Sequence, residues 1–203
     1  MEVEAKYRAV EAINPEDIEA LDLAPYTLGP REFHDLHDTL LDTAERDIGR
    51  YQYALRVRRD GEKVFLTLKG PKIRQGNTTW RPEWEEALDN GDPDDVTSWP
   101  PIFQEQVRLM SDGKSLLPQL HVRNRRYTWM LYRQGAQVAE IALDRGTIHA
   151  GEAEEPMHEL EVELKGGDEA DLNAIVAMLR SALPLVTETR GKAERGFALL
   201  AKG

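Results

Sequence analysis

Charged and apolar residues alternate in segments at both ends of the chain. In the segment Met157–Lys165 every second residue from Glu159 onward is charged, and the residues between are apolar. The chain begins with the same pattern, in which Glu2, Glu4 and Lys6 alternate with apolar side chains. A period of two predicts β-strands with one charged and one apolar face. Carboxylates in a row repel each other, so water, cationic side chains or a metal ion must lie beside them. We therefore expect one polar site built from both ends of the chain.

Several other segments place charged side chains in the same alternating pattern. The acids expected on the polar faces are Glu2, Glu4, Glu83, Glu85, Glu140, Asp144, Glu159, Glu161 and Glu163, and the bases are Lys6, Arg56, Arg58, Lys69, Arg81 and Arg126. Carboxylate oxygens are ligands for hard divalent cations such as Mg²⁺ or Mn²⁺. Arginine and lysine side chains bind phosphate oxygens. A cavity with both kinds of group would bind a polyanion that carries a metal ion, such as a polyphosphate or a nucleoside triphosphate.

Other phosphate and catalytic motifs are missing from the sequence. No GxxxxGK[ST] segment occurs, so the phosphates would not lie in a P-loop. No GxSxG motif and no cysteine is present, which leaves no sign of covalent catalysis. His34 and His37 are three residues apart in an extended segment and do not share a face, so we expect ordinary solvated or hydrogen-bonded histidines.

The charged segments must be positioned by many antiparallel strands. Turn signals at Asp60-Gly61, Gly76-Asn77 and Gln134-Gly135 separate strand-like segments. Helical patterns follow Asn14-Pro15 and cover the ranges 101–110, 168–183 and 191–201, and the range 89–101 has the composition of a linker.

The strands and helices together predict an α+β fold. In the favoured architecture, an antiparallel β-barrel encloses the polar faces, and helices packed outside cover the apolar faces. The alternative is an ordinary sandwich whose strand charges face solvent. Periodicity alone leaves both architectures open.

Composition limits the classes of protein and partner. The chain has 203 residues with 31% charged residues, which suits one domain of fair size. No apolar run approaches the roughly 20 residues that span a membrane, and the first residues carry no secretory signal. The formal net charge of −11 makes a general nucleic-acid binder unexpected. With no cysteines, we expect a cytoplasmic protein.

Blocks along the whole chain resemble one known family. The matching blocks, in order, are Glu2–Lys6 (EVEAK), Leu55–Arg58 (LRVR), Thr67–Lys69 (TLK), Arg81–Glu85 (RPEWE), Glu140–Asp144 (EIALD), Glu159–Leu164 (ELEVEL) and Lys192–Gly196 (KAERG). They resemble the CYTH superfamily, or triphosphate tunnel metalloenzymes, and most of all the CYTH domains of bacterial inorganic triphosphatases. The resemblance implies a single CYTH domain over residues 1–203 and an eight-stranded antiparallel tunnel. It also implies metal-dependent hydrolysis of inorganic triphosphate to diphosphate and phosphate.

The resemblance also implies roles for individual residues. The implied metal ligands are Glu2, Glu4, Asp144, Glu159 and Glu161. The implied substrate-binding residues are Lys6, Arg56, Arg58, Lys69, Arg81, Arg126 and Lys192. The implied catalytic residues are Lys6, Glu83, Glu85 and Glu140, of which the glutamates would orient the bases and the attacking water. Lys6 or a tunnel glutamate would position or deprotonate this water, and cations around Lys6 would ease loss of its proton.

Two segments depart from the family pattern, and several alternative functions remain open. Gly191-Lys192 stands where the family often has Ser-Lys, and Leu40–Thr43 replaces a segment that commonly carries two tyrosines. The alternatives are processing of an organic triphosphate, as in thiamine triphosphatase or class IV adenylate cyclase, or a non-catalytic sensor of polyphosphate or nucleotide. We expect a small-molecule triphosphate as partner, no membrane, and a monomer or homodimer.

Overall fold

The computed structural model describes residues 2–76 and 78–201. Met1, Asn77 of the predicted Gly76-Asn77 turn and residues 202–203 lie outside this description. The strands are β1 (Glu2–Ala9), β2 (Thr27–Asp42), β3 (Ala54–Asp60), β4 (Lys63–Lys69), β5 (Ile73–Gln75), β6 (Thr78–Arg81), β7 (Glu83–Ala87), β8 (Leu117–Arg133), β9 (Ala136–Ala150), β10 (Ala153–Leu164) and β11 (Leu185–Thr187). The helices are α1 (Pro15–Glu19), α2 (Asp47–Arg50), α3 (Pro101–Ser111), α4 (Glu169–Ala182) and α5 (Lys192–Leu200), with a short 3-10 helix, η1 (Val96–Ser98), inside the predicted linker.

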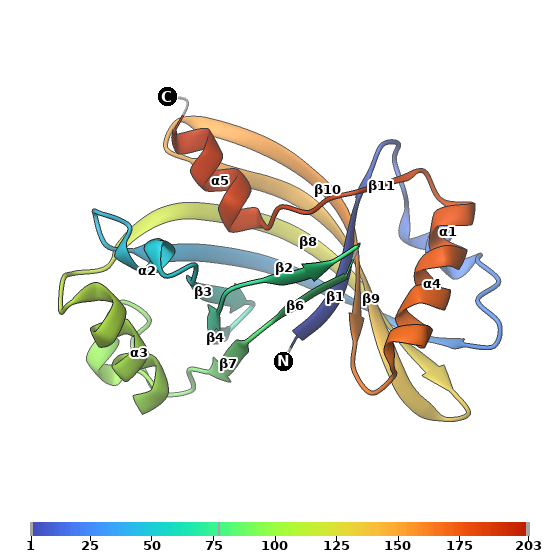
Figure 1. Ribbon diagram of the computed structural model, residues 1–203, viewed down its shortest axis with the longest axis horizontal. Coiled ribbons are helices and arrows are strands. Elements are labelled where there is room, and N and C mark those ends of the chain that lie inside the picture. The colour runs from blue at the N-terminus through green and yellow to red at the C-terminus, as the bar shows by residue number, and fades with distance from the viewer. Residues whose placement is uncertain (1, 77, 202–203) are drawn as a thin grey trace.

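The strands curl into one antiparallel sheet (Figure 1). Across the described residues its order is β5-β6-β1-β10-β9-β8-β2-β3-β4-β7, with β11 beside β1. β6 pairs with β1 near one end of this order, and β7 pairs with β4 at the other. Only Pro82 separates β6 from β7 in the chain, so a single covalent segment connects the two sides of the curled sheet.

The predicted strand number of eight differs from the structure. Eleven strands occur in the described part of the chain. Pro82 has no N–H to donate and divides one extended segment into β6 and β7. β5 and β11 are additional strands of 3 residues each, and such short pieces carry too little alternation to be seen in the sequence.

Tight turns connect the long strands that form the back of the sheet. Gln134 and Gly135 are the whole connection between β8 and β9, and both have positive φ, 52° and 83°. Two successive left-handed residues make the type of hairpin turn whose twist matches that of the flanking strands. The predicted turns at Gln134-Gly135 and Asp60-Gly61 are both confirmed.

Helices cover the outer face of the sheet, as predicted for most of them. Leu160 and Val162 of β10 turn outward and belong to the same buried cluster as Leu172 and Ile175 of α4. A second cluster joins α3 to the outer faces of β3 and β4, where Leu55 is buried. No helix in the described residues is long and apolar enough to cross a membrane.

Helix α5 departs from the prediction because it packs on the concave face of the sheet (Figure 1). Phe197 of α5 packs with Leu120, Ile148 and Met157, and Met157 shares the face of β10 that carries the charged residues. A Cβ atom on Gly196 would lie 2.5 Å from a methyl carbon of Leu120, so glycine allows this close approach. The helix therefore covers part of the concave face of the sheet.

Candidate active site

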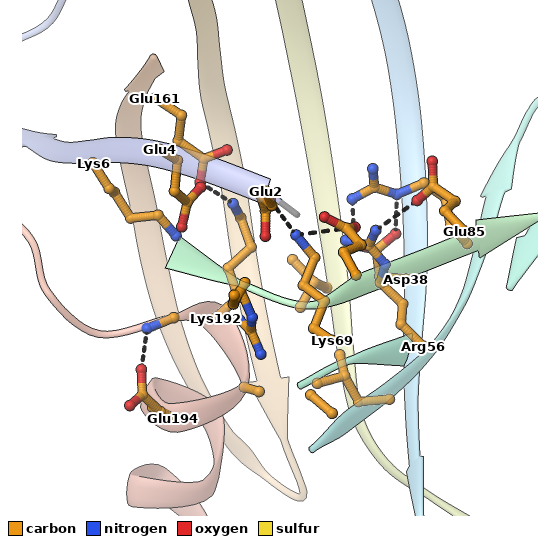
Figure 2. A pocket seen from close by; sticks show the side chains of 18 of the residues that line it. Glu2, Glu4, Lys6, Asp38, Arg56, Lys69, Glu85, Glu161, Lys192 and Glu194 are labelled. Atoms are coloured by element: carbon orange, nitrogen blue, oxygen red, sulfur yellow. Dashed lines mark hydrogen bonds and ion pairs between the residues drawn. The ribbon is translucent and has the colours of Figure 1, made fainter. Parts of the chain in front are cut away.

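The inner face of the sheet encloses a cavity of about 1220 Å³ whose wall is strongly charged (Figure 2). The sequence-predicted residues that line it are Glu2, Glu4, Lys6, Arg56, Arg58, Lys69, Arg81, Glu83, Glu85, Arg126, Glu140, Glu161 and Lys192. Acids and bases from distant parts of the chain thus share one enclosed surface. This arrangement excludes the alternative in which the strand charges lie on an open outer face. Glu163, another acid of the alternating pattern, also lines the cavity.

Pairing between the first and tenth strands joins the two ends of the chain. In the antiparallel register of β1 and β10, Lys6 lies opposite Glu161, and Glu4 lies opposite Glu163. The Lys6 Nζ atom is 2.9 Å from Glu161 Oε1 and 3.8 Å from Glu159 Oε2. The expectation of one polar site built from both ends of the chain is confirmed by this register.

The surroundings of Lys6 differ from those that we expected for a base. Burial alone would lower the pKa of Lys6, but the carboxylates of Glu161, Glu159 and Glu4 outweigh burial and raise it. The expectation that nearby cations ease loss of its proton is therefore wrong. As an ammonium group Lys6 can hold an oxygen atom, and its catalytic role stays a prediction.

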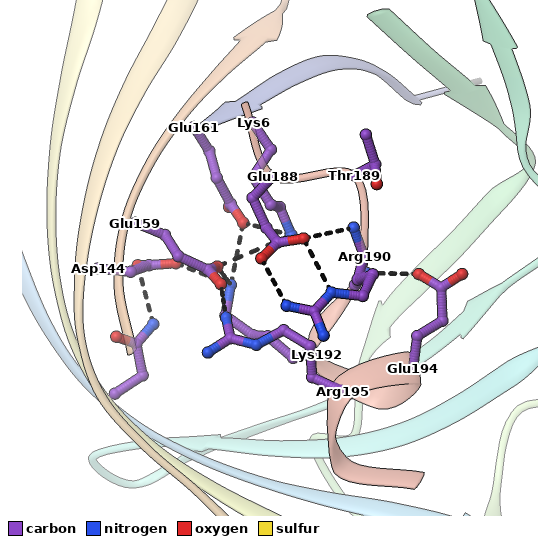
Figure 3. A network of polar contacts seen from close by, with 12 residues as sticks. Lys6, Asp144, Glu159, Glu161, Glu188, Thr189, Arg190, Lys192, Glu194 and Arg195 are labelled. Atoms are coloured by element: carbon purple, nitrogen blue, oxygen red, sulfur yellow. Dashed lines mark hydrogen bonds and ion pairs between the residues drawn. The ribbon is translucent and has the colours of Figure 1, made fainter. Parts of the chain in front are cut away.

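Three carboxylates form a buried cluster behind one part of the cavity wall (Figure 3). Asp144, Glu159 and Glu161 each offer an oxygen atom, and these atoms lie within 4.8 Å of one another. Asp144 and Glu159 are fully buried and do not line the cavity, whereas Glu161 does. Lys192 lines the cavity beside Asp144 and Glu159, the two acids that do not line it. Its Nζ atom lies 2.9 Å from Asp144 Oδ2, 2.9 Å from Glu161 Oε1 and 3.3 Å from Glu159 Oε2.

Arg126 holds the same cluster from β8. Its Nε and Nη2 atoms each donate to Asp144 at 2.7 Å, and Nη2 also donates to Glu161 Oε2 at 2.5 Å. Burial alone would raise the pKa of Asp144, but Arg126 and Lys192 outweigh it and hold that pKa well below its usual value. Lys192, Lys6 and Arg126 likewise outweigh burial at Glu161 and keep its pKa low. The carboxylates of Asp144 and Glu161 are therefore ionised at neutral pH.

Arg195 is a member of this network that sequence analysis did not single out. Its side chain is buried on α5 and donates to Glu159 (Figure 3). Its Nε atom also donates to Glu155 Oε1 at 2.7 Å. It lies three residues after Lys192, a spacing that places two side chains on one side of a helix. That spacing was the available signal. Arg195, which does not line the cavity, neutralises Glu159.

The carboxylate donors suit a hard divalent cation. Oxygen-only ligands of this kind are the ones that Mg²⁺ and Mn²⁺ prefer. The Glu2 Oε2 atom is buried without a hydrogen-bond partner in the described structure, while Glu2 Oε1 lies 2.5 Å from Lys69 Nζ. The five predicted ligands do not form one cluster, because only Asp144, Glu159 and Glu161 meet closely. The cluster could hold a metal ion, and Glu2 and Glu4 line the adjoining cavity.

Asp38 is a second residue that sequence analysis missed. Its carboxylate holds two of the arginines that are predicted to bind phosphate. Arg58 donates to both of its oxygens, at 2.7 and 2.8 Å, and Arg56 Nη1 donates at 3.3 Å. Burial would raise the pKa of Asp38, but Arg56 and Arg58 outweigh it and bring the pKa down to about 2. Asp38 lies opposite Arg58 in the β2–β3 register, a relation that only the strand pairing reveals.

The predicted acids on β7 lie beside predicted bases. Glu85 Oε2 lies 3.2 Å from Arg56 Nη2, and Glu83 Oε1 lies 3.2 Å from Lys69 Nζ. These positions suit the expected task of orienting bases. Glu140 makes a weaker ion pair, since the Nζ atom of Lys165 lies 3.9 Å from its Oε1 atom. The catalytic roles of these glutamates stay predictions.

The chain resembles known proteins in sequence and in fold. The family described as CYTH domain matches residues 1–197. The inorganic triphosphatase of Haemophilus influenzae is 29% identical over 182 residues, which are 89% of this chain and 50% of that protein. The chain thus spans about half the length of this curated relative.

Solved structures with low sequence identity share the fold. One is a putative adenylyl cyclase from Hippeastrum, described as having a dominant triphosphatase activity. It aligns with a TM-score of 0.64 at 19% identity and covers 100% of this chain and 96% of its own. A protein from Pyrococcus horikoshii aligns with a TM-score of 0.57 at 24% identity over 100% of both chains. The family match over nearly the whole length shows that the chain belongs to the CYTH domain family.

Proposed function

We propose that the protein hydrolyses inorganic triphosphate to diphosphate and phosphate inside its charged cavity, with Mg²⁺ or Mn²⁺. The observation that carries the proposal is the cavity itself, in which arginine and lysine side chains face carboxylates across an enclosed space. The likeness to the Haemophilus inorganic triphosphatase supports the choice of substrate. The proposal takes residues 1–203 as one domain that acts in the cytoplasm as a monomer or homodimer.

The basic residues would hold the phosphate chain. Arg56 and Arg58 are fixed by Asp38, so their guanidinium groups are already ordered before an anion arrives. Arg126 and Lys192 donate hydrogen bonds to carboxylates in this structure, and the N–H groups of each can also donate to a phosphate oxygen. The cations would therefore neutralise the substrate and fix its orientation.

The acidic residues would hold a metal ion and organise the water. Asp144, Glu159 and Glu161, with Glu2 and Glu4 nearby, are the residues that would hold the ion. When bound, it would polarise phosphate oxygens and stabilise the charge of the leaving diphosphate. The oxygen of a water molecule forms a bond to a terminal phosphorus atom, the bridging P–O bond breaks, and diphosphate leaves. Lys6 would hold an oxygen of the substrate or position the water, and a cavity glutamate would take the proton of the water.

Phosphate release from tripolyphosphate tests the proposal. The purified chain would be assayed with Mg²⁺, with Mn²⁺ and with EDTA, beside Glu4→Gln and the surface variant Glu154→Gln. We expect turnover that needs a metal, is largely lost in Glu4→Gln and is unchanged in Glu154→Gln. Thiamine triphosphate and ATP in the same assay define the substrate preference. A folded chain that binds tripolyphosphate but releases no phosphate would overturn the proposal in favour of an organic triphosphate or a sensor.

A further inference from the structure

Two basic residues outside the predicted set line the cavity near the start of α5. Lys72 precedes β5 and Arg74 lies within it, and both belong to the cavity wall. Their shared partner is the carboxylate of Glu194 in the first turn of α5. Lys72 Nζ donates to Glu194 Oε2, and Arg74 Nη2 lies 3.5 Å from Glu194 Oε1. Figure 2 shows Glu194 and its ion pair beside the Lys192 end of the cavity.

Glu194 also has a structural task in its own helix. The Gly191 N–H donates to Glu194 Oε2 at 2.5 Å, which caps the N-terminus of α5. A helix cap needs only an oxygen acceptor, and it does not need the two cations at positions 72 and 74. The ion pairs with Lys72 and Arg74 therefore call for an explanation beyond capping.

The positive charge of Lys72 adds to that of the nearby residues that are predicted to bind phosphate. Burial lowers the pKa of Lys72, and the like charges of Lys6 and Arg81 lower it further, while Glu194 opposes the shift. The Lys72 side chain is only 16% exposed. A Cβ atom on Gly191 would lie 3.1 Å from Lys72 Nζ, so the missing side chain at this position leaves room for the ammonium group next to Lys192. A phosphate chain held at Lys6 and Lys192 would have Lys72 within its path.

Size and charge favour an anion longer than triphosphate. The cavity of about 1220 Å³ exceeds the roughly 300–1,000 Å³ of typical small-molecule sites. A terminal phosphoryl group offers three strong acceptor oxygens, where a carboxylate offers two. The Glu194 side chain is 49% exposed, so water can solvate its carboxylate when the cations leave it.

We propose that Lys72 and Arg74 form an additional phosphate subsite, which the carboxylate of Glu194 fills until a longer anion displaces it. The ligand class is linear inorganic polyphosphate of four or more phosphoryl groups. Glu194 thereby weakens the binding of these longer chains relative to triphosphate. The inference rests on the proposed function, because it extends the same cavity.

Glutamine at position 194 separates the two tasks of this side chain. Glu194→Gln keeps an oxygen acceptor for the Gly191 N–H and removes only the charge. Dissociation constants for tripolyphosphate and tetrapolyphosphate would be measured by titration calorimetry in EDTA, so that neither metal nor turnover contributes. We expect Glu194→Gln to bind tetrapolyphosphate about fivefold more tightly, the size of a partly exposed ion pair, and tripolyphosphate with less than about a twofold change. Lys72→Met should weaken tetrapolyphosphate binding selectively.

A matched control lies elsewhere on the wall of the same cavity. Glu32 of β2 also lines the cavity, and its ion-pair partner is His34, 3.8 Å away, rather than Lys72 or Arg74. Glu32→Gln removes one negative charge without touching Lys72, so the ratio of the two dissociation constants should stay as in the wild type. Thermal unfolding of each variant reports whether the cap and the fold are intact.

The outcomes distinguish this inference from the proposed function. Equal tightening of both anions by Glu194→Gln, or none, would overturn the subsite while leaving tripolyphosphate binding in place. A wild-type chain that binds neither anion and releases no phosphate would overturn the proposed function and the subsite together. Selective tightening in Glu194→Gln, lost again when Lys72→Met is added, is the result that supports the subsite.

Discussion

Replacing Asp38 with asparagine should lower the free energy of unfolding at pH 7 by about 2.5 kcal/mol. The pKa of Asp38 falls from its ordinary value of 3.8 to about 2, because Arg56 and Arg58 outweigh the effect of burial. Each pKa unit corresponds to about 1.4 kcal/mol. Since the folded-state pKa lies below the ordinary value, the stabilisation is complete above about pH 4, falls to about half at pH 3 and is lost near pH 2.

Urea unfolding at pH 3, 4 and 7 would measure this contribution. The difference between the wild type and Asp38→Asn should shrink from about 2.5 kcal/mol at pH 7 to about 1.3 kcal/mol at pH 3. Asp35→Asn is the matched control on the same strand, because the Asp35 side chain is 63% exposed, and it should change the free energy of unfolding by less than about 0.5 kcal/mol. A difference for Asp38→Asn that is equal at pH 3 and pH 7 would refute the reasoning.

Two further variants test the buried network and the phosphate ligands. Arg195→Met removes the hydrogen-bond donor of fully buried Glu159, which keeps only the more distant Lys192 and Lys6, and should destabilise the fold by about 3 kcal/mol. By scanning calorimetry Tm should then fall by about 6–12 °C, and a Tm within about 2 °C of the wild type, as expected for exposed Arg108→Met, would contradict this. Lys192→Gln should raise the Kd for tripolyphosphate in EDTA about tenfold, through loss of one charge-assisted hydrogen bond. Exposed Lys63→Gln is its control, and an equal Kd in both variants would argue against Lys192 as a ligand.

Alternation in the sequence predicts which residues face inward but not how deep they lie. Lys6, Arg56 and Glu161 line the cavity as expected, because successive side chains of any strand point to opposite faces. Asp144 and Glu159 have the correct face as well, yet they are buried behind Lys192. Their depth depends on where α5 packs, and a strand pattern carries no information about that.

Pairing between distant strands accounts for what the sequence did not reveal. The amphipathic pattern of α5 shows that one side is apolar, but either face of a sheet could receive it. Asp38 acquires its role only when β2 pairs with β3 and brings Arg58 opposite. Pro82 suits no central position in a strand, but its place as the link between β6 and β7, near opposite ends of the strand order, follows only from closure of the sheet.

The pairing of β1 with β10 has a consequence for how the chain is made. Lys6 and Glu161 face each other in register although they are far apart in the sequence. At about 5–20 residues per second a ribosome needs about 8–30 s to add the roughly 155 residues between them. Throughout that interval the first strand lacks β10, although β6 on its other side is made earlier, and its hydrated charges discourage pairing with a neighbouring nascent chain. The polar site thus forms only after β10 has been made, and a nascent chain that stops before β10 has no acidic cluster.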